Sequence, residues 1–208
     1  MTSHRQLSGH EVQEADRRVR RTRKAFQEAL LSLLEEKSYG DITVQDIARR
    51  ADYNRVTFYA HFRDKDDLVR QVITEKLQGL IDTIRIPAQK GTEIELSPTD
   101  NPWILRMFKY VYENGEFFRI FYLDKKVPGF FRMLYNAMWD YFHDEVQLKL
   151  NVDAKAEFDE EMYTDYVTAA ILGVIGYWVR KGFKYSPKHM AEQLTEIVYH
   201  RPHKLLIR

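Results

Sequence analysis

The stretch DITVQDIARRADYNRVTFYAHFRDKDDLV, residues 41–69, decides the fold of this chain. It contains two short segments with apolar residues at helical spacing, 43–51 and 55–62, separated by turn-forming residues at 52–54. Two short helices joined by a turn of three residues make a helix-turn-helix. We therefore predict a helix-turn-helix over residues 43–62, with its second helix suited to the major groove of DNA.

The side chains of this segment divide into an inner and an outer set. Ala48 is small enough to let two helices cross closely. The apolar anchors of the two helices are Ile47, Ala51, Phe58 and Phe62. Once these are buried, the residues left facing outward near the start of the second helix are Arg55, Val56, Thr57 and Tyr59. Side chains at that end of a recognition helix reach the bases.

Polar residues mark where the two helices begin. Thr43 and Asp46 have the spacing of a capping box, in which each side chain accepts a hydrogen bond from the other residue's amide. Asn54 is a suitable cap for the second helix. Asp52 falls at the turn position that requires left-handed backbone geometry.

Residues 20–69 resemble the DNA-binding domain of the TetR family of bacterial transcriptional regulators, a match over about a quarter of the chain. The motifs that carry the resemblance are Thr43-Val44, Ile47-Ala48, Thr57-Phe58-Tyr59, Phe62 and Lys65. The family usually has glycine where this chain has Asp52, a departure that costs about 1 kcal/mol because aspartate tolerates left-handed geometry better than most residues.

The resemblance implies roles for individual side chains. The residues expected at phosphates are Thr43, Tyr59, His61 and Lys65, and those expected near bases are Gln45, Arg55, Val56 and Thr57. Hydroxyl and ammonium groups beside helix N-termini suit phosphate oxygens, and an arginine fork suits guanine. Tyr59 is also consistent with a half-buried packing residue, and His61 with an ordinary surface histidine.

The segment before the motif is strongly basic. Residues 1–15 are polar and unpatterned and predict a flexible arm, after which a helix runs from Arg17 to Glu36 and ends at Gly40. Six of the eight residues from Arg17 to Lys24 are basic. This run is consistent with a solvated helix face or with a contact to the DNA backbone or minor groove.

Beyond the motif the pattern is helical throughout, so we predict an all-α chain with a helix-turn-helix domain over 16–64 and a helical ligand-binding and dimerisation domain over 65–208. A long amphipathic helix covers 65–84, and Pro and Gly residues predict a loop over 86–101. The later helices are predicted at 102–113, 115–123, 128–149, 157–181 and 186–200.

Aromatic residues are dense between positions 103 and 142. The resemblance implies a pocket there for a small apolar or aromatic effector, although the same residues are consistent with an ordinary core. The side chains proposed for this pocket are Trp103, Phe108, Tyr112, Phe121, Tyr135 and Trp139.

A single helix-turn-helix covers one half-site, so we expect a homodimer on a palindromic double-stranded operator. The predicted interface is a small-residue strip on helix 157–181, consisting of Ala169, Ala170, Gly173 and Gly176. By the resemblance, the last two helices pair with their symmetry mates as a four-helix bundle. The same helix is also consistent with a central position in its own monomer.

Composition and motifs exclude other classes of protein. The chain lacks cysteine, a secretory leader, an apolar run long enough for a membrane span, and the phosphate-loop, zinc and nucleophile motifs of common enzymes. We expect no enzyme activity, metal or cofactor and a cytoplasmic location. The predicted function is a repressor released from its operator by a small molecule, or alternatively a DNA-binding coactivator or adaptor controlled by a protein partner.

Overall fold

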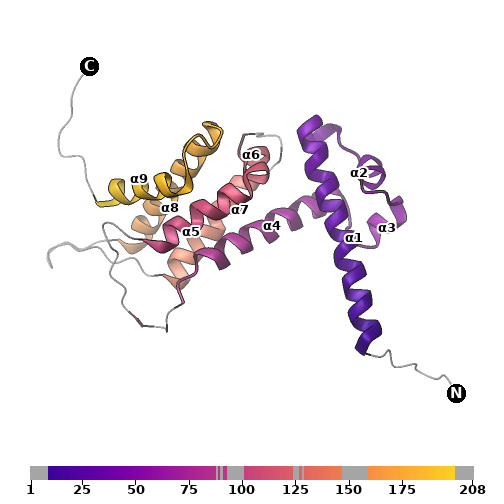
Figure 1. Cartoon of the computed structure of the whole chain (residues 1–208), viewed down its shortest axis with the longest axis horizontal. Helices are drawn as coiled ribbons and strands as arrows, with labels where there is room; N and C mark the ends of the chain where they lie inside the picture. Colours follow the sequence, from indigo (N-terminus) through magenta and orange to yellow (C-terminus); the bar gives the residue numbers. More distant parts are fainter. Residues whose placement is uncertain are drawn as a thin grey trace. The chain divides into compact units, whose positions relative to one another are not determined.

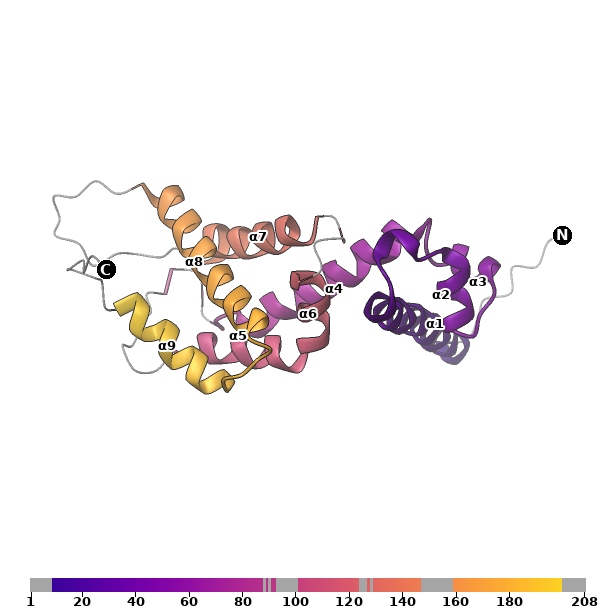
Figure 2. The same cartoon turned by 90° about the horizontal axis from the view of Figure 1, so that it is seen from above.

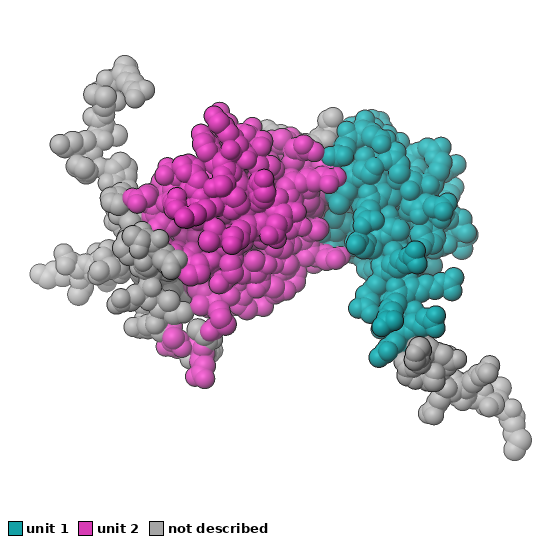
Figure 3. Space-filling view, in the orientation of Figure 1, with its two compact units in different colours: residues 1–72 teal, residues 73–208 magenta. Residues whose placement is uncertain are grey.

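The computed structural model describes residues 9–87, 89, 91–92, 101–123, 127, 129–146 and 159–199, and within these ranges the chain is helical with no strand. This confirms the predicted all-α class. The chain divides into two compact units, residues 1–72 and 73–208 (Figure 3). The division falls inside a helix, eight residues later than the predicted boundary at 64/65.

Unit 1 consists of α1 (Gly9–Glu36), a 3₁₀ turn (Tyr39–Asp41), α2 (Val44–Arg50), α3 (Arg55–Tyr59) and the first turns of α4 (Lys65–Ile84) (Figures 1 and 2). Its core is aromatic, since the Phe26 ring meets Phe58 edge-on at 5.3 Å and Phe62 at 6.0 Å between centroids. Such edge-to-face pairs add to the energy gained by burying the rings. The start of α4 belongs to this unit because Leu68 and Val69 are buried in it.

The two ends of α1 differ from the prediction. The helix begins at Gly9, not Arg17, so residues 9–15 are helical and not a flexible arm, while residues 1–8 lie outside the described part. Acidic residues one helical turn ahead of arginines, such as Glu14 before Arg18, favour a helix even without a core to pack on. The predicted role of Gly40 was also wrong, because α1 ends at Glu36 and Gly40 lies in the 3₁₀ turn without a positive φ.

Unit 2 contains the rest of α4, then α5 (Pro102–Glu113), α6 (Gly115–Leu123), α7 (Phe130–Asp140) ending in a π-helical turn (Tyr141–Glu145), α8 (Glu160–Arg180) and α9 (Pro187–Tyr199). These bounds agree with the predicted helices to within three residues, except that the helix expected to reach 149 ends at Glu145. The predicted helix starts at 128 and 157 lie outside the described residues. None of the helices in the described ranges is long and apolar enough to span a membrane.

The core of unit 2 is centred on Trp178, which is fully buried. Its ring meets Phe108 edge-on at 5.4 Å and stacks on Tyr112 at 5.9 Å, and its Nε1 donates to the Tyr185 carbonyl at 3.0 Å. Trp178 therefore joins α8 to α5 and to the connection before α9. At the far end of α4, a bidentate pair between Arg85 and Glu145, at 2.7 Å for both bonds, joins that helix to the π-helical turn.

Candidate nucleic-acid interface

The start of α2 is fixed by a capping box, as predicted. Thr43 Oγ1 accepts from the Asp46 amide at 3.1 Å, and Asp46 Oδ2 accepts from the Thr43 amide at 3.0 Å. Lys37 Nζ reaches the same carboxylate at 2.8 Å. The hydrogen bond from Lys37, followed by those from Thr43, holds the pKa of Asp46 well below its usual range. At neutral pH the carboxylate is therefore charged and accepts the hydrogen bonds that fix the first turn of α2.

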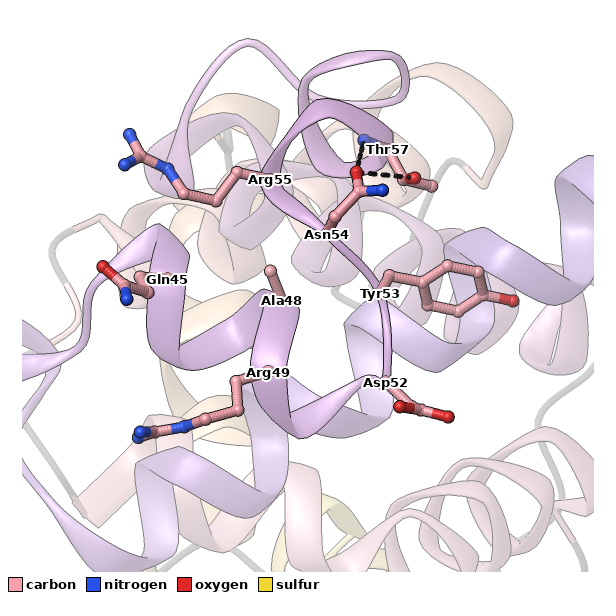
Figure 4. A pocket seen from close by; sticks show the side chains of 8 residues that line it. All are labelled: Gln45, Ala48, Arg49, Asp52, Tyr53, Asn54, Arg55 and Thr57. Carbon is pink, nitrogen blue, oxygen red and sulfur yellow. Dashed lines mark hydrogen bonds between the residues drawn. The ribbon is translucent and has the colours of Figure 1, made fainter.

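The turn between α2 and α3 has the geometry that the sequence predicts. Asp52 adopts a φ of 59°, and the Tyr53 amide donates to the Ala48 carbonyl at 2.9 Å. Asn54 Oδ1 then caps α3 by accepting from the Thr57 amide at 2.8 Å and from the Thr57 hydroxyl at 3.0 Å (Figure 4). The N-terminus of α3 is thus fixed by the side chain of its cap as well as by the turn before it.

The second helix of the motif is shorter than predicted. It ends at Tyr59 and not at Phe62, although Phe58 and Phe62 are both buried as expected. The Phe62 side chain still reaches the core because the chain continues to turn past the end of α3. The amides of His61 and Phe62 both donate to the Phe58 carbonyl. The predicted anchor Ala51 is half-buried and closes α2.

A polar hollow of about 630 Å³ lies between α2 and the start of α3. It is lined by Gln45, Ala48, Arg49, Asp52, Tyr53, Asn54, Arg55 and Thr57 (Figure 4). In Figure 4 the side chains of Gln45, Arg49 and Arg55 extend to the same side, away from Asp52. These three side chains form a row of hydrogen-bond donors, and two of them carry positive charge.

Arg49 was not among the predicted contact residues. It lies four residues after Gln45, so the two share one face of α2, and helical spacing alone could have identified it. The Arg49 side chain is 79% exposed and pairs with Asp46 at 3.2 Å. A pair so exposed holds the guanidinium weakly and leaves it available to another anion.

The predicted contact residues of α3 differ in exposure. Val56 is 79% exposed and Tyr59 is 49% exposed, with the Tyr59 ring lying edge-on to Phe58 at 5.5 Å. Tyr59 therefore combines the packing role and the outward role considered for it. Thr57 is half-buried, and its hydroxyl proton is used by the Asn54 cap.

His61 is half-buried beside the aromatic core of unit 1. Its ring centroid lies 6.5 Å from that of Phe26 and 6.3 Å from that of Phe62. Burial, and then the positive charge of Arg23, lower the pKa of His61 below its ordinary value. In the absence of DNA, the lowered pKa favours the uncharged imidazole at neutral pH.

Lys65 lies where the start of α4 meets the connection between α1 and α2. Its ammonium donates to the carbonyl oxygens of Tyr39 and Ile42, both at 2.7 Å, and lies 4.2 Å from the centre of the Tyr39 ring. The Tyr39 hydroxyl in turn donates to Asp66. Burial lowers the pKa of Lys65. The side chain predicted to bind phosphate is therefore also a structural clamp, with one of its three protons uncommitted.

The six predicted pocket aromatics do not gather around one point in the structure. Phe108 and Tyr112 share Trp178 as a neighbour, whereas Phe121 belongs to a separate cluster with Phe117 and Phe130. The remaining three have other partners: Trp103 meets Phe142, Trp139 stacks on His143, and Tyr135 donates to Asp165 at 2.6 Å. The effector pocket stays a prediction.

The predicted dimer strip on α8 is only partly a surface. Ala169, Ala170 and Gly173 are exposed, but Gly176 is buried. A Cβ atom at Gly176 would lie 2.6 Å from Tyr122 Cε1, so this glycine is small because a ring of its own chain packs on it. Gly176 is therefore not part of the exposed strip. The exposed stripe along α8 consists instead of Met162, Tyr166, Ala169, Ala170, Gly173 and Tyr177.

Comparisons with known proteins agree on the class of protein. The model for bacterial regulatory proteins of the tetR family matches residues 28–72, and a model for a transcriptional regulator C-terminal region of that family matches residues 100–200. YxbF, an HTH-type transcriptional regulator of Bacillus subtilis, is 28% identical over 205 residues, which is 93% of this chain and 49% of YxbF. DhaS of Lactococcus lactis, the dhaKLM operon transcriptional activator, is 27% identical over 146 residues, which is 70% of this chain and 65% of DhaS. The chain thus spans about half to two thirds of the length of these relatives.

Solved structures show the same fold. A TetR transcriptional regulator from Streptococcus agalactiae superposes with a TM-score of 0.62 at 18% identity, covering 90% of this chain and 98% of that one. The FadR regulator of Bacillus subtilis, crystallised with stearoyl-CoA, superposes with a TM-score of 0.57 at 14% identity, covering 84% and 96%. With the two family models covering both units and the helix-turn-helix in place, the chain belongs to the TetR family of bacterial DNA-binding transcriptional regulators.

Proposed function

We propose that this protein is a dimeric regulator that recognises a palindromic double-stranded operator through α2 and α3. The observation that carries the proposal is the hollow at the capped start of α3, with Gln45, Arg49 and Arg55 extending to one side of it. Arg55 stands at the first position of α3 and has the fork that binds guanine O6 and N7. Val56, exposed beside it, suits the methyl group of thymine.

The second subunit is proposed to pack on the exposed stripe of α8. Met162 and Tyr166 are 58% and 68% exposed, and the small residues Ala169, Ala170 and Gly173 leave room for a helix to approach closely. The outer end of α9 adds Ile197 and Val198, which are more than half exposed. Apolar side chains on two neighbouring helices are typical of a subunit interface.

The proposed regulation is repression of transcription. A small apolar or aromatic effector would relieve it by favouring a dimer in which the spacing of the two helix-turn-helix units no longer fits the operator. Two structural neighbours support the two halves of this proposal. NalD of Pseudomonas aeruginosa, which superposes with a TM-score of 0.57 at 19% identity, is the secondary repressor of a multidrug efflux pump, and FadR forms a complex with stearoyl-CoA. Activation through a protein partner is the second candidate, and it is favoured by the similarity to DhaS, which is an activator. As a regulator of bacterial genes, the protein would act in the cytoplasm.

The test begins by selecting the genomic fragments that the full chain binds and defining the shared sequence. Arg55→Ala should then weaken binding to that sequence by about 1–3 kcal/mol and relax the preference at one base pair per half-site. Arg132→Ala is the matched control, because Arg132 is an exposed arginine on α7 in unit 2. Equal losses on the selected sequence and on random DNA would contradict base reading by Arg55.

A reporter gene placed behind the selected sequence separates the two modes of regulation. Deleting the regulator should raise expression if the protein is a repressor and lower it if the protein is an activator. Stearoyl-CoA is a practical first effector to test, since FadR, which has the same fold, was crystallised in complex with it. An effector that binds the dimer without changing operator affinity would contradict control by induction.

A further inference from the structure

The N-terminal part of α1 extends well beyond the core of unit 1. The helix starts at Gly9, but Thr22 is the first of its described side chains to be buried. At 1.5 Å per residue, about 20 Å of helix precedes that point. Figures 1 and 3 show this end of α1 projecting past α2 and α3.

This projecting segment carries a basic stripe, which we define as Arg17, Arg20, Arg21 and Lys24. The spacings of three, one and three residues place these side chains on one face of the helix, and all of them are exposed. Arg17, Arg20 and Arg21 pair with no carboxylate among the described residues, and Lys24 pairs with Glu28 at 3.6 Å while remaining 74% exposed. Three of the four positive charges of the stripe are thus open to an external anion.

The helix that carries the basic stripe packs against the connection between α2 and α3, which carry the proposed reading residues. Thr22 Oγ1 is 3.5 Å from the Tyr53 hydroxyl, and the Phe26 ring is 5.3 Å from the Tyr53 ring. Tyr53 directly precedes Asn54, the cap of α3. Arg17 is five residues ahead of Thr22, which is about 8 Å along the helix axis. The stripe therefore runs past this contact along α1, on the face of the helix that is turned away from Tyr53.

The stripe lies on the side of α1 opposite Thr22 and Phe26, where no other element of the described chain covers it. Its composition points to one kind of partner. Guanidinium and ammonium groups bind phosphate oxygens, and Val19 is the one large apolar side chain exposed among the described residues from Gln13 to Lys24. A membrane-binding helix needs a continuous apolar face, and this segment has none.

Resting on the proposed function, we infer that the basic stripe of α1 binds the sugar-phosphate backbone of DNA flanking the base pairs read by α3. Because these contacts are to phosphates, they add affinity on any sequence and do not determine which operator is chosen. The helical form matters, since it fixes the spacing of the charges and avoids the entropy cost of ordering a flexible arm on binding.

The experiment compares full-length proteins on a labelled random-sequence duplex of about 30 base pairs, between roughly 50 and 200 mM salt. The stripe variant is Arg17→Gln with Arg20→Gln and Arg21→Gln. The control variant removes the same charge from exposed lysines of unit 2: Lys181→Gln, Lys184→Gln and Lys188→Gln. A third variant, with lysine at the three stripe positions, keeps the charge.

We expect the stripe variant to bind at least about 10-fold more weakly near 0.1 M salt, with the slope of log Kd against log salt reduced by about 0.9 for each phosphate that the stripe no longer neutralises. The control variant and the lysine variant should keep the slope of the wild type. A stripe variant with the wild-type slope, whether or not its affinity falls, overturns the inference and leaves base reading by α3 intact. Failure of the wild type itself to bind any duplex would instead refute the proposed function.

Discussion

At the scale of single residues, the helix-turn-helix depends on side chains that hydrogen-bond to the backbone as well as on side chains that face outward. Thr43 and Asn54 cap the two helices, and Asp46 completes the capping box of α2. Asp52 adopts the left-handed geometry of the turn that precedes α3. Lys65 belongs with these structural residues through its two carbonyl contacts. Its replacement would therefore change stability as well as any phosphate contact.

His61 gives a prediction on pH. Its pKa is lowered in the folded state by burial and by Arg23, so the unfolded chain takes up a proton more readily than the folded chain below the ordinary value of 6.5. This contribution to stability is complete above that pH and is lost as the pH falls through 6.5 towards the folded pKa. Urea unfolding between neutral and mildly acidic pH should show a smaller decline for His61→Gln than for the wild type.

The control for this experiment is His189→Gln, which changes an exposed histidine of α9. This variant measures what the loss of a histidine elsewhere in the chain does to the stability. Parallel stability curves for the wild type and His61→Gln would contradict the assigned pKa shift of His61.

At the scale of elements, α8 shows how one helix uses small residues for two purposes. Gly176 lets Tyr122 pack against the helix, where the Tyr122 hydroxyl donates to the Leu172 carbonyl at 2.6 Å. Burial of that hydroxyl raises the pKa of Tyr122 to about 12. At Gly173, three residues earlier, a Cβ would meet no atom within 4 Å beyond the backbone of its own helical turns.

These two glycines give a matched prediction. Gly176→Ala should lower the free energy of unfolding by about 1–3 kcal/mol, because the new methyl group must displace the Tyr122 ring. Gly173→Ala should raise it by up to about 1 kcal/mol in the monomer, since alanine is the better helix former and meets nothing. Urea denaturation at low protein concentration measures both, and similar effects of the two substitutions would contradict the packing assigned to Gly176.

At the scale of the whole molecule, the two units carry different surfaces. Unit 1 has the polar hollow and the basic stripe, and unit 2 has the exposed stripe of α8. One helix-turn-helix buries little surface on DNA, so affinity for a palindromic operator depends on linking two helix-turn-helix domains in a dimer.

The dimer prediction uses Tyr166→Asp, which places a charge at the most exposed large side chain of the α8 stripe. A buried aromatic at the centre of an interface typically contributes about 2 kcal/mol or more, so this variant should sediment as a monomer at concentrations where the wild type is a dimer. Its affinity for a two-half-site duplex should fall at least about 10-fold. Phe131→Asp, at an exposed aromatic of α7, is the control and should remain dimeric. A dimeric Tyr166→Asp would place the interface elsewhere.

The helix-turn-helix and most helix ends were predictable from the sequence because they depend on neighbours in the chain. Caps, left-handed turn residues and apolar periodicity act over three or four positions, and the capping box at Thr43 and the cap at Asn54 follow such short-range rules. The early start of α1 was missed because the segment has no apolar stripe, so periodicity gave no signal there.

What only the tertiary structure decided involves residues far apart in the chain. Lys65 meets the carbonyls of Tyr39 and Ile42, and Gly176 meets Tyr122, so neither role is visible in local spacing. The aromatics of unit 2 likewise pair between helices, which separates side chains that the sequence groups together. Local hydrogen-bonding preferences thus determined the helix-turn-helix, whereas packing between distant helices determined which polar and small residues remain available for a partner.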